Sequence, residues 1–174
     1  MALLPIITAP DPRLKVKARP VAKVDATVRR LMDDMVETMY QAIGIGLAAP
    51  QVGVALRVIV LDVAREGEKP NQIRLANPEI LWRADETTVS NEGCLSLPEH
   101  YAEVTRPAGI RLRYLDHENE IREIDAEGLL ATCVQHEIDH LDGVLFVDHI
   151  SALKRGMILR KLQKAKRSRE LERA

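Results

Sequence analysis

A metal-binding pattern within residues 135–140 constrains this chain more than any other segment. The six residues read Q-H-E-I-D-H, so His136 and His140 lie four positions apart with Glu137 between them. On an α-helix this spacing places both imidazoles on one face, where they can bind a single metal ion. A carboxylate beside such a metal can transfer protons. The pattern therefore predicts a metal-bearing helix and a hydrolytic site, which still requires a third protein ligand.

Hydrophobic spacing predicts three helices. Apolar residues recur at intervals of three and four over residues 25–41, and Asp25 is placed to cap this N-terminal amphipathic helix. A second helix is predicted over residues 126–142, with Gly143 as its stop, and it carries the metal-binding pattern. A third helix begins at Ser151 and continues to the C-terminal end of the chain.

The segment between the first two helices has β character, because apolar residues alternate there between turn signals such as Asn77-Pro78. The predicted strands cover residues 56–61, 73–76, 79–82, 86–90, 103–105, 109–116 and 120–125. No repeat or linker divides the sequence, so a single domain over residues 1–174 is expected. The expected fold class is α+β, with mostly antiparallel short-stranded sheets around the central metal-binding helix.

Charge is distributed unevenly along the chain. The formal net charge is -1 at pH 7, but residues 151–174 contain nine Lys or Arg and only two Glu. A basic C-terminal helix joined to an acidic body favours a polyanionic partner. A solvated helix end without a partner is the simpler alternative.

Cysteine content and the uncharged segments indicate the compartment. The chain has two cysteines, Cys94 and Cys133, which are too few for a disulfide framework and typical of a reducing environment. The first residues lack the features of a signal or transit peptide. The longest uncharged stretch, residues 38–56, contains three Gly and a Pro, which argues against a membrane span. We therefore expect a cytoplasmic protein with no membrane partner.

The third metal ligand is not found where common metallopeptidases have it. A metzincin would require a histidine at position 146, which is Phe146. A thermolysin-like enzyme would place a glutamate roughly twenty residues after the pattern, and Arg160 is found there. Upstream, Cys94 lies in a turn of small residues, and a thiolate with two imidazoles suits a divalent transition metal. A buried cysteine that only packs is the alternative.

Three segments resemble the signature motifs of the peptide deformylase family, in the same order and at familiar spacings. They are G-I-G-L-A-A-P-Q at residues 44–51, E-G-C-L-S at residues 92–96 and the Q-H-E-I-D-H run. The similarity covers nearly the whole chain. It implies a hydrolase that removes the N-formyl group from the N-terminal formylmethionine of newly synthesised polypeptides and releases formate.

The resemblance also implies which residues hold the metal. Cys94, His136 and His140 would be the ligands, and Glu137 would take a proton from water and pass it to the departing amine. Bacterial deformylases characteristically use ferrous iron, often replaced after purification. Fe(II) is therefore expected in the cell, with Zn(II) or Ni(II) possible in the purified protein.

Other residues are assigned to the substrate by the same resemblance. The amide of Gln51 and the backbone N–H of Leu95 would stabilise negative charge on the formyl oxygen. The implied substrate-binding residues are Gly44, Ile45, Gly46, Gly93, Leu129 and Cys133. Glu92 and Arg106 fall where the family has these residue types, so we expect them to pair and to steady the Cys94 loop. Tyr101 stands where some members carry Arg, so the resemblance does not carry a contact with the substrate backbone over to this position.

The implied partners are formylmethionyl nascent peptides and the ribosome. In bacterial members a basic C-terminal helix docks near the exit of the peptide tunnel, where RNA phosphates supply negative charge. A monomer is expected. Two alternative functions stay open at this stage, a zinc metallopeptidase of the H-E-x-x-H type and a catalytically silent ribosome-associated binding module. The presence of Gln51, Cys94 and Glu137 argues against the silent module.

Overall fold

Three α-helices and seven strands make up the computed structural model, which describes residues 2–173. The helices are α1 (Ala26–Gln41), α2 (Gly128–Leu141) and α3 (Ala152–Arg173). The strands are β1 (Gly46–Ala48), β2 (Val58–Leu61), β3 (Ile73–Arg83), β4 (Thr87–Cys94), β5 (Leu97–Pro107), β6 (Gly109–Leu115) and β7 (Ile121–Glu127). Short 3-10 helices, η1 (Pro12–Lys15), η2 (Ala49–Val52) and η3 (Phe146–His149), lie in the connecting segments.

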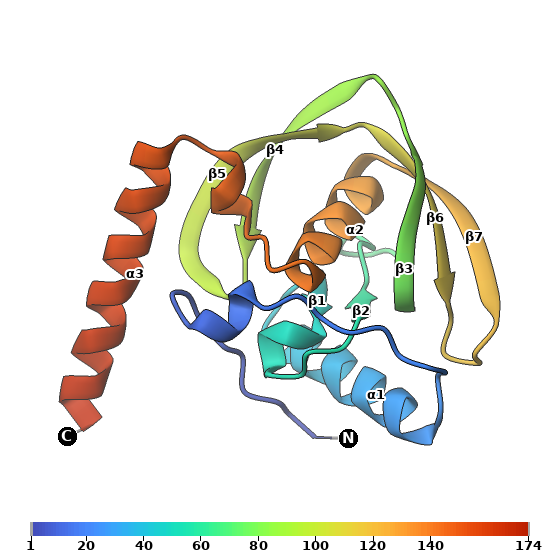
Figure 1. Ribbon diagram of the computed structural model, residues 1–174, viewed down its shortest axis with the longest axis horizontal. Coiled ribbons are helices and arrows are strands. Elements are labelled where there is room, and N and C mark those ends of the chain that lie inside the picture. Colours follow the sequence, from blue (N-terminus) through green and yellow to red (C-terminus); the bar gives the residue numbers. More distant parts are fainter. Residues whose placement is uncertain (1, 174) are drawn as a thin grey trace.

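The strands form two sheets around α2. Five strands pair in the order β1-β2-β3-β6-β7, and β4 pairs with β5 in a separate two-stranded sheet. The strand pairs within residues 2–173 are all antiparallel. Helix α2 runs through the middle of the molecule, α1 lies below it, and α3 stands at one edge (Figure 1). This arrangement confirms the predicted α+β class with antiparallel sheets around a central helix.

Helix α1 follows its predicted extent. The Asp25 side chain caps it by accepting a hydrogen bond from the Val28 N–H at 2.9 Å. The buried apolar face packs on β1 and β2 and consists of Val28, Met32, Met35, Val36 and Met39. Beyond the last turn, Ile43 adopts a left-handed φ of 58°, and the Gly44 N–H donates to the Met39 carbonyl.

Glycines set both ends of α2. Strand β7 runs directly into the helix, and Gly128 takes a φ of 58° at the junction, a conformation that glycine adopts without steric cost. The predicted start at residue 126 is wrong, because Ala126 and Glu127 still pair with β6. At the other end, Gly143 takes a φ of 75° and donates its N–H to the His140 carbonyl.

Strand β3 passes through the predicted break at Asn77-Pro78. Asn77 has a φ of 49° and coincides with a register shift opposite β6, so residues 73–76 and 79–82 belong to one bent strand. The Asn77 side chain accepts from the Val21 N–H at 2.9 Å and donates to the Val21 carbonyl at 2.8 Å. The turn signal therefore marks a bulge that ties the N-terminal segment to the sheet.

Pairing near the motifs extends beyond the predicted strands. The sequence predicts no strand at β1, because its three residues are too few to show alternation and include Gly46 and Ala48, which are uncommon in strands. Strands β4 and β5 run eight and eleven residues, whereas only residues 86–90 and 103–105 were predicted. The longer hairpin places Cys94 at the last position of β4, directly before a two-residue turn.

Three apolar clusters form the core. One lies between α2 and the five-stranded sheet and includes Ile59, Leu75, Leu112, Val134 and Leu141. The second lies between α1 and strands β1 and β2. The third joins the N-terminal segment, β5, η3 and α3, and includes Leu14, Leu97, Phe146 and Leu162.

Helix α3 contributes little to this core. Leu162 is its one buried residue in the described part of the chain, and most of its basic side chains are exposed. Across residues 2–173, no helix has both the length and the apolar character required to cross a membrane.

Shortening a core side chain tests this packing. Leu112 is 0% exposed in the cluster beneath α2, so Leu112→Ala is expected to lower the free energy of unfolding by about 2–5 kcal/mol. Ile121 is 70% exposed, so Ile121→Ala is expected to change it by less than about 0.5 kcal/mol. Urea denaturation measures both, and equal midpoints for the two variants would contradict the described core.

Candidate metal centre and active site

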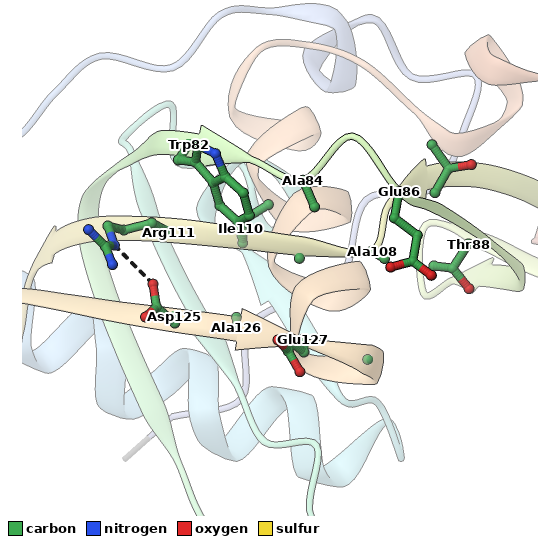
Figure 2. Close-up of a pocket in the computed structure, with 13 residues that line it drawn as sticks. Trp82, Ala84, Glu86, Thr88, Ala108, Ile110, Arg111, Asp125, Ala126 and Glu127 are labelled. Atoms are coloured by element: carbon green, nitrogen blue, oxygen red, sulfur yellow. Dashed lines mark hydrogen bonds and ion pairs between the residues drawn. The ribbon is translucent and has the colours of Figure 1, made fainter.

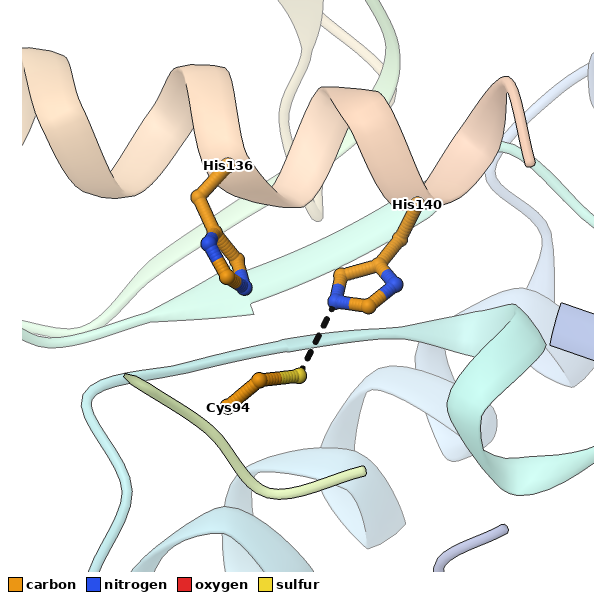
Figure 3. A group of neighbouring side chains, drawn as sticks. All are labelled: Cys94, His136 and His140. Carbon is orange, nitrogen blue, oxygen red and sulfur yellow. Dashed lines mark hydrogen bonds between the residues drawn. The ribbon is translucent and has the colours of Figure 1, made fainter. Parts of the chain in front are cut away.

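One face of α2 and the end of β4 bring three potential metal ligands together. His136 and His140 project from the helix toward Cys94 (Figure 3). The Cys94 Sγ lies 3.3 Å from His140 Nε2, and one potential ligand atom from each residue lies within 4.8 Å of the others. A thiolate and two imidazoles at such distances suit a divalent transition metal. The structure thus places the three predicted ligands side by side.

Each ring can present Nε2 to a metal ion. Burial alone would lower the pKa of His136, but hydrogen bonds with Cys94 and Glu92 raise it well above its usual value, so metal binding must displace the second proton of this ring. His136 Nδ1 donates to Glu92 Oε1 at 2.9 Å, which leaves its Nε2 for a metal ion. Burial lowers the pKa of His140 well below its usual value, and a neutral ring is the form that binds metal. His140 Nδ1 is buried and has no hydrogen-bond partner within residues 2–173. These residues therefore fit the metal that the sequence predicts.

A buried ion pair supports His136 from behind. Arg106 donates from Nε to Glu92 Oε2 at 2.6 Å and from Nη2 to Oε1 at 2.9 Å, so the predicted pairing is present. Arg106 Nη1 also donates to Asp139 Oδ2 at 2.8 Å, and His149 Nε2 lies 2.8 Å from the same oxygen. Burial alone would raise the pKa of Glu92, but hydrogen bonds from His136 and Arg106 outweigh burial and lower it. Glu92 is thus held as a carboxylate.

Glu137 occupies a different environment on the pocket side of the helix. Its Oε1 lies 3.9 Å from His136 Nε2, and its buried Oε2 has no hydrogen-bond partner among residues 2–173. Burial raises the pKa of Glu137 to about 7. A Cβ at Gly46 would lie 3.0 Å from Glu137 Oε1, so glycine lets the chain pass this close without displacing the carboxyl group.

The Gln51 side chain is fixed with its NH2 group toward the metal ligands. Its Oε1 accepts a hydrogen bond from the Ala48 N–H at 2.9 Å, within the short helix η2. Its Nε2 donates to Ser96 Oγ at 3.0 Å and lies 3.5 Å from Cys94 Sγ. The residue is 1% exposed. Gln51 therefore both caps a turn and presents an amide donor at the candidate site.

Leu95 follows Cys94 in the turn between β4 and β5. The neighbouring Ser96 N–H points back to Cys94 Sγ at 3.4 Å. In the described part of the chain the Leu95 N–H has no acceptor, so this donor is available to a ligand.

A pocket of about 400 Å³ opens in front of these groups. The predicted site residues among its lining are Gly44, Ile45, Gly46, Gln51, Gly93, Cys94, Leu95, Leu129, Cys133, His136 and Glu137. His140 is 1% exposed, which makes it the most deeply buried of the three potential metal ligands. Burial raises the pKa of the Cys133 thiol, and its Sγ lies 3.7 Å from the Ile45 carbonyl, so Cys133 lines the pocket as a neutral thiol.

Two unpaired strand edges border the same pocket. Strand β1 is the edge of the five-stranded sheet, and β4 pairs on one side only. The Ile45 carbonyl accepts from the Asp62 N–H at 2.9 Å, whereas the Ile45 N–H has no acceptor within residues 2–173. Gly93 lies on the β4 side of the pocket. An extended peptide could pair with such edges by strand addition.

A second hollow, of about 780 Å³, lies over β3, β6 and β7 (Figure 2). It is larger than the first, but its lining contains no cysteine or histidine. Trp82 stands at its border, and Arg111 Nε donates to Asp125 Oδ1 at 2.9 Å beside it. Its chemistry therefore gives no reason to place the metal centre there.

The structure adds site residues that the sequence did not single out. Ser96 is buried and holds the Gln51 amide, and its place in the E-G-C-L-S motif was an available signal. Asp139 joins Arg106 to His149, because both side chains contact its Oδ2. Ile43 and Glu99 line the mouth of the pocket, and no sequence pattern marks either of them.

Removing the Glu92 carboxylate tests whether the ion pair positions the metal ligands. Glu92→Ala leaves Arg106 buried without its main partner, so we expect a loss of about 3–5 kcal/mol in unfolding free energy together with lower metal content. The double variant Glu92→Leu/Arg106→Leu should recover much of the stability but not the metal. Urea denaturation and elemental analysis measure the two effects.

The exposed pair Arg111–Asp125 is the matched control. Asp125→Ala should leave both the urea midpoint and the metal content unchanged. Full metal content in Glu92→Ala would contradict a positioning role for Glu92.

Comparison with known proteins identifies the family. Residues 3–156 match the sequence model of the family described as polypeptide deformylase. The chain is 61% identical over 168 residues to a peptide deformylase of Methylocella silvestris, a match that covers 95% of this chain and 86% of that protein. It is 57% identical over 164 residues to a peptide deformylase of Phenylobacterium zucineum, covering 94% and 97%.

A solved structure agrees with these sequence matches. The crystal structure of peptide deformylase from Ehrlichia chaffeensis in complex with actinonin superposes with a TM-score of 0.92 at 42% identity, covering 96% of this chain and 99% of that chain. The resemblance predicted from the three motifs is thereby confirmed, and the chain belongs to the polypeptide deformylase family.

Proposed function

We propose that Cys94, His136 and His140 hold the metal ion with which this chain removes the N-formyl group from the formylmethionine of new polypeptides. The reaction follows from the family, because the chain is a metal-dependent hydrolase of the deformylase class. The observation that carries the ligand assignment is the convergence of one thiol and two imidazoles beside a pocket. When bound, the metal acts as a Lewis acid and lowers the pKa of a coordinated water toward neutrality.

Glu137 is the proposed proton carrier. It accepts a proton from the attacking water. It then passes this proton to the amine nitrogen of methionine as the bond between that nitrogen and the formyl carbon breaks. A pKa of about 7 supports this role, because a group near the working pH can both accept and donate. Its unpartnered, buried Oε2 also supports the role, since no other group in residues 2–173 competes for that oxygen.

Gln51 and Leu95 are the proposed donors to the formyl oxygen. Negative charge gathers on this oxygen as the carbonyl carbon becomes tetrahedral. The Gln51 amide is held in advance by Ala48 and Ser96, so little reorganisation is needed during the reaction. The Leu95 N–H provides a second donor from the turn that also carries Cys94.

The peptide is proposed to bind as an added strand between β1 and β4. The Ile45 N–H and the backbone of Gly93 would pair with it, which places the methionine side chain against the inner wall of the pocket. Leu129, Cys133 and the His136 ring supply the apolar surface of that wall. Gly44 and Gly46 are proposed to border the peptide. Glycine at these positions lets the segment lie against Leu95 and Cys133, since a Cβ would meet one of those side chains.

Ferrous iron is the proposed metal in the cell, with zinc or nickel replacing it after purification. A soft thiolate with two imidazoles accepts any of these ions, and the family resemblance favours iron. A single cytoplasmic domain over residues 1–174 that acts as a monomer stays a prediction from the sequence.

The basic helix α3 is the proposed contact with the ribosome near the exit of the peptide tunnel. The helix packs on the body chiefly through Leu162, Ile158 and Leu159. This leaves Lys161, Lys164 and Arg167 exposed and free to meet RNA phosphates.

The comparisons do not favour the two alternative functions. A metallopeptidase would need a ligand from position 146 or 160. Phe146 is buried, with its ring centroid 6.3 Å from that of His136, and Arg160 is exposed on α3. A silent binding module would not require the buried, oriented Gln51 and Glu137.

An anaerobic assay of formate release from formyl-Met-Ala-Ser tests the catalytic roles. Glu137→Ala should lower kcat by about 10²- to 10⁴-fold, because a proton carrier is lost. Gln51→Ala should lower it by about 10²- to 10³-fold, because a donor to the formyl oxygen is lost. Elemental analysis should find the metal retained in both variants.

His117 is exposed and lies outside the pocket, so His117→Ala is the control expected to keep the parent rate. No formate from the metal-loaded parent would overturn the proposed function. Equal cleavage of unformylated Met-Ala-Ser would favour a peptidase.

Charge neutralisation on α3 tests the ribosome contact without disturbing the third core cluster. Lys161→Gln, Lys164→Gln and Arg167→Gln together should weaken ribosome binding and reduce the slope of log K against log salt by about 0.7–0.9 for each RNA phosphate that is no longer neutralised. The matched control changes three exposed lysines elsewhere, Lys17→Gln, Lys23→Gln and Lys69→Gln. Equal binding of both triple variants, measured by co-sedimentation, would remove α3 as the contact.

A further inference from the structure

One aspartate holds both ends of the turn that leads from α1 to the active-site pocket. Asp62 directly follows β2, and its Oδ2 accepts a hydrogen bond from the Tyr40 hydroxyl, in the last turn of α1, at 2.5 Å. The Asp62 backbone N–H donates to the Ile45 carbonyl at 2.9 Å. The same residue therefore fixes the chain at position 40 and again at position 45.

The carboxylate of Asp62 also anchors the loop that follows β2. Its Oδ1 accepts from the Ala64 N–H at 3.0 Å, and its Oδ2 accepts from the Asn71 N–H at 3.2 Å. Burial alone would raise the pKa of Asp62, but hydrogen bonds from Tyr40 and these two amides outweigh burial and lower it. Asp62 is thus held as a carboxylate. We call Asp62, Tyr40 and Asn71 the Asp62 clamp.

The turn that the clamp closes contains an unfavourable backbone conformation. Ile43 has a φ of 58°, in a region that β-branched residues rarely adopt. The other non-glycine residues with positive φ within residues 2–173 are Asn77, Glu99 and Asn119, none of which is β-branched. The Ile43 side chain is 92% exposed, so its own packing cannot hold this conformation. Backbone strain persists only where surrounding contacts determine the conformation, and the clamp supplies such contacts.

The strained turn forms one wall of the active-site pocket. Residues 43–46 all line it, and the strand β1 that begins at Gly46 is only three residues long. The Ile45 N–H has no acceptor in the described part of the chain. A shift of the turn would therefore move a backbone donor that faces the peptide site. The candidate metal ligands lie on α2 and β4, outside this turn.

We propose that Asp62 is a positioning residue for the reaction, and that together with Tyr40 it holds residues 43–45 in the conformation that binds the peptide. The inference rests on the proposed function, in which the Ile45 N–H pairs with an extended peptide. This pairing is present both before and during the reaction, so its loss weakens binding of the substrate and of the transition state alike. The clamp therefore acts on KM and not on kcat.

Kinetics of formate release from formyl-Met-Ala-Ser by the metal-loaded protein test the clamp. Tyr40→Phe removes only the hydroxyl group and should raise KM by about threefold or more. Asp62→Ala removes all the side-chain hydrogen bonds of the clamp and should raise KM by about tenfold or more. Both variants should retain the metal and keep kcat within about twofold of the parent value.

Asp116 provides a matched control. It is 8% exposed and accepts hydrogen bonds from the Glu118 N–H at 2.9 Å, the Glu120 N–H at 3.0 Å and Arg122 Nε at 2.8 Å. Asp116 follows β6 and is absent from the lining of the pocket. Asp116→Ala should therefore lower the urea midpoint to an extent similar to Asp62→Ala, yet keep the parent KM.

A double-mutant cycle tests whether the clamp acts through the strained turn. Asparagine accepts positive φ, so Ile43→Asn reduces the strain that the clamp has to hold. The rise in KM caused by Asp62→Ala should then be about threefold or more smaller in the Ile43→Asn background than in the parent. An undiminished rise would contradict the action through Ile43.

Two results would overturn the positioning role while leaving deformylation intact. One is the parent KM in folded Tyr40→Phe and Asp62→Ala variants. The other is an equal rise in KM for Asp116→Ala, because the effect would then follow from stability alone. If Asp62→Ala fails to fold, Tyr40→Phe decides the question. Absence of formate from the parent would instead contradict the proposed function.

Discussion

The buried contact of Glu92 with His136 and Arg106 is the interaction on which the site depends. Strands β4 and β5 share no hydrogen-bonded ladder with the five-stranded sheet, so side chains must join the small sheet to α2. Glu92 comes from β4, Arg106 from β5 and Asp139 from α2, and their hydrogen bonds span this junction. Buried ion pairs add little net stability relative to apolar packing. The value of this one is positional, because it sets Cys94 opposite the two histidines.

The two glutamates beside His136 show how environment divides one residue type between two roles. Glu92 accepts hydrogen bonds from a guanidinium and an imidazole, and they lower its pKa. Glu137 lies one residue from His136 in the chain, yet burial without a comparable partner raises its pKa to about 7. One carboxylate therefore keeps a fixed charge that orients a ring, and the other is suited to exchange a proton.

Local patterns carried most of what could be predicted. The spacing of His136 and His140 and the cap at Asp25 depend on neighbours within one or two turns, so the sequence alone indicated α1 and α2. The small strand β1 and the orientation of Gln51 depend on contacts between distant segments, which no local pattern encodes. The left-handed backbone conformation of Ile43 could not be predicted from the sequence, because isoleucine normally avoids positive φ. Such exceptions arise where function outweighs local preference.

The open edges of β1 and β4 also limit when a peptide can react, relative to the folding of the protein to which it belongs. A peptide that binds as the strand between them must offer its first residues fully extended, with their backbone N–H and C=O groups unpaired. An N-terminus already wound into a helix, or hydrogen-bonded within its own domain, cannot meet that requirement. Reaction and substrate folding thus compete for the same backbone groups, and the chain ends that this pocket reaches are those that have not yet folded.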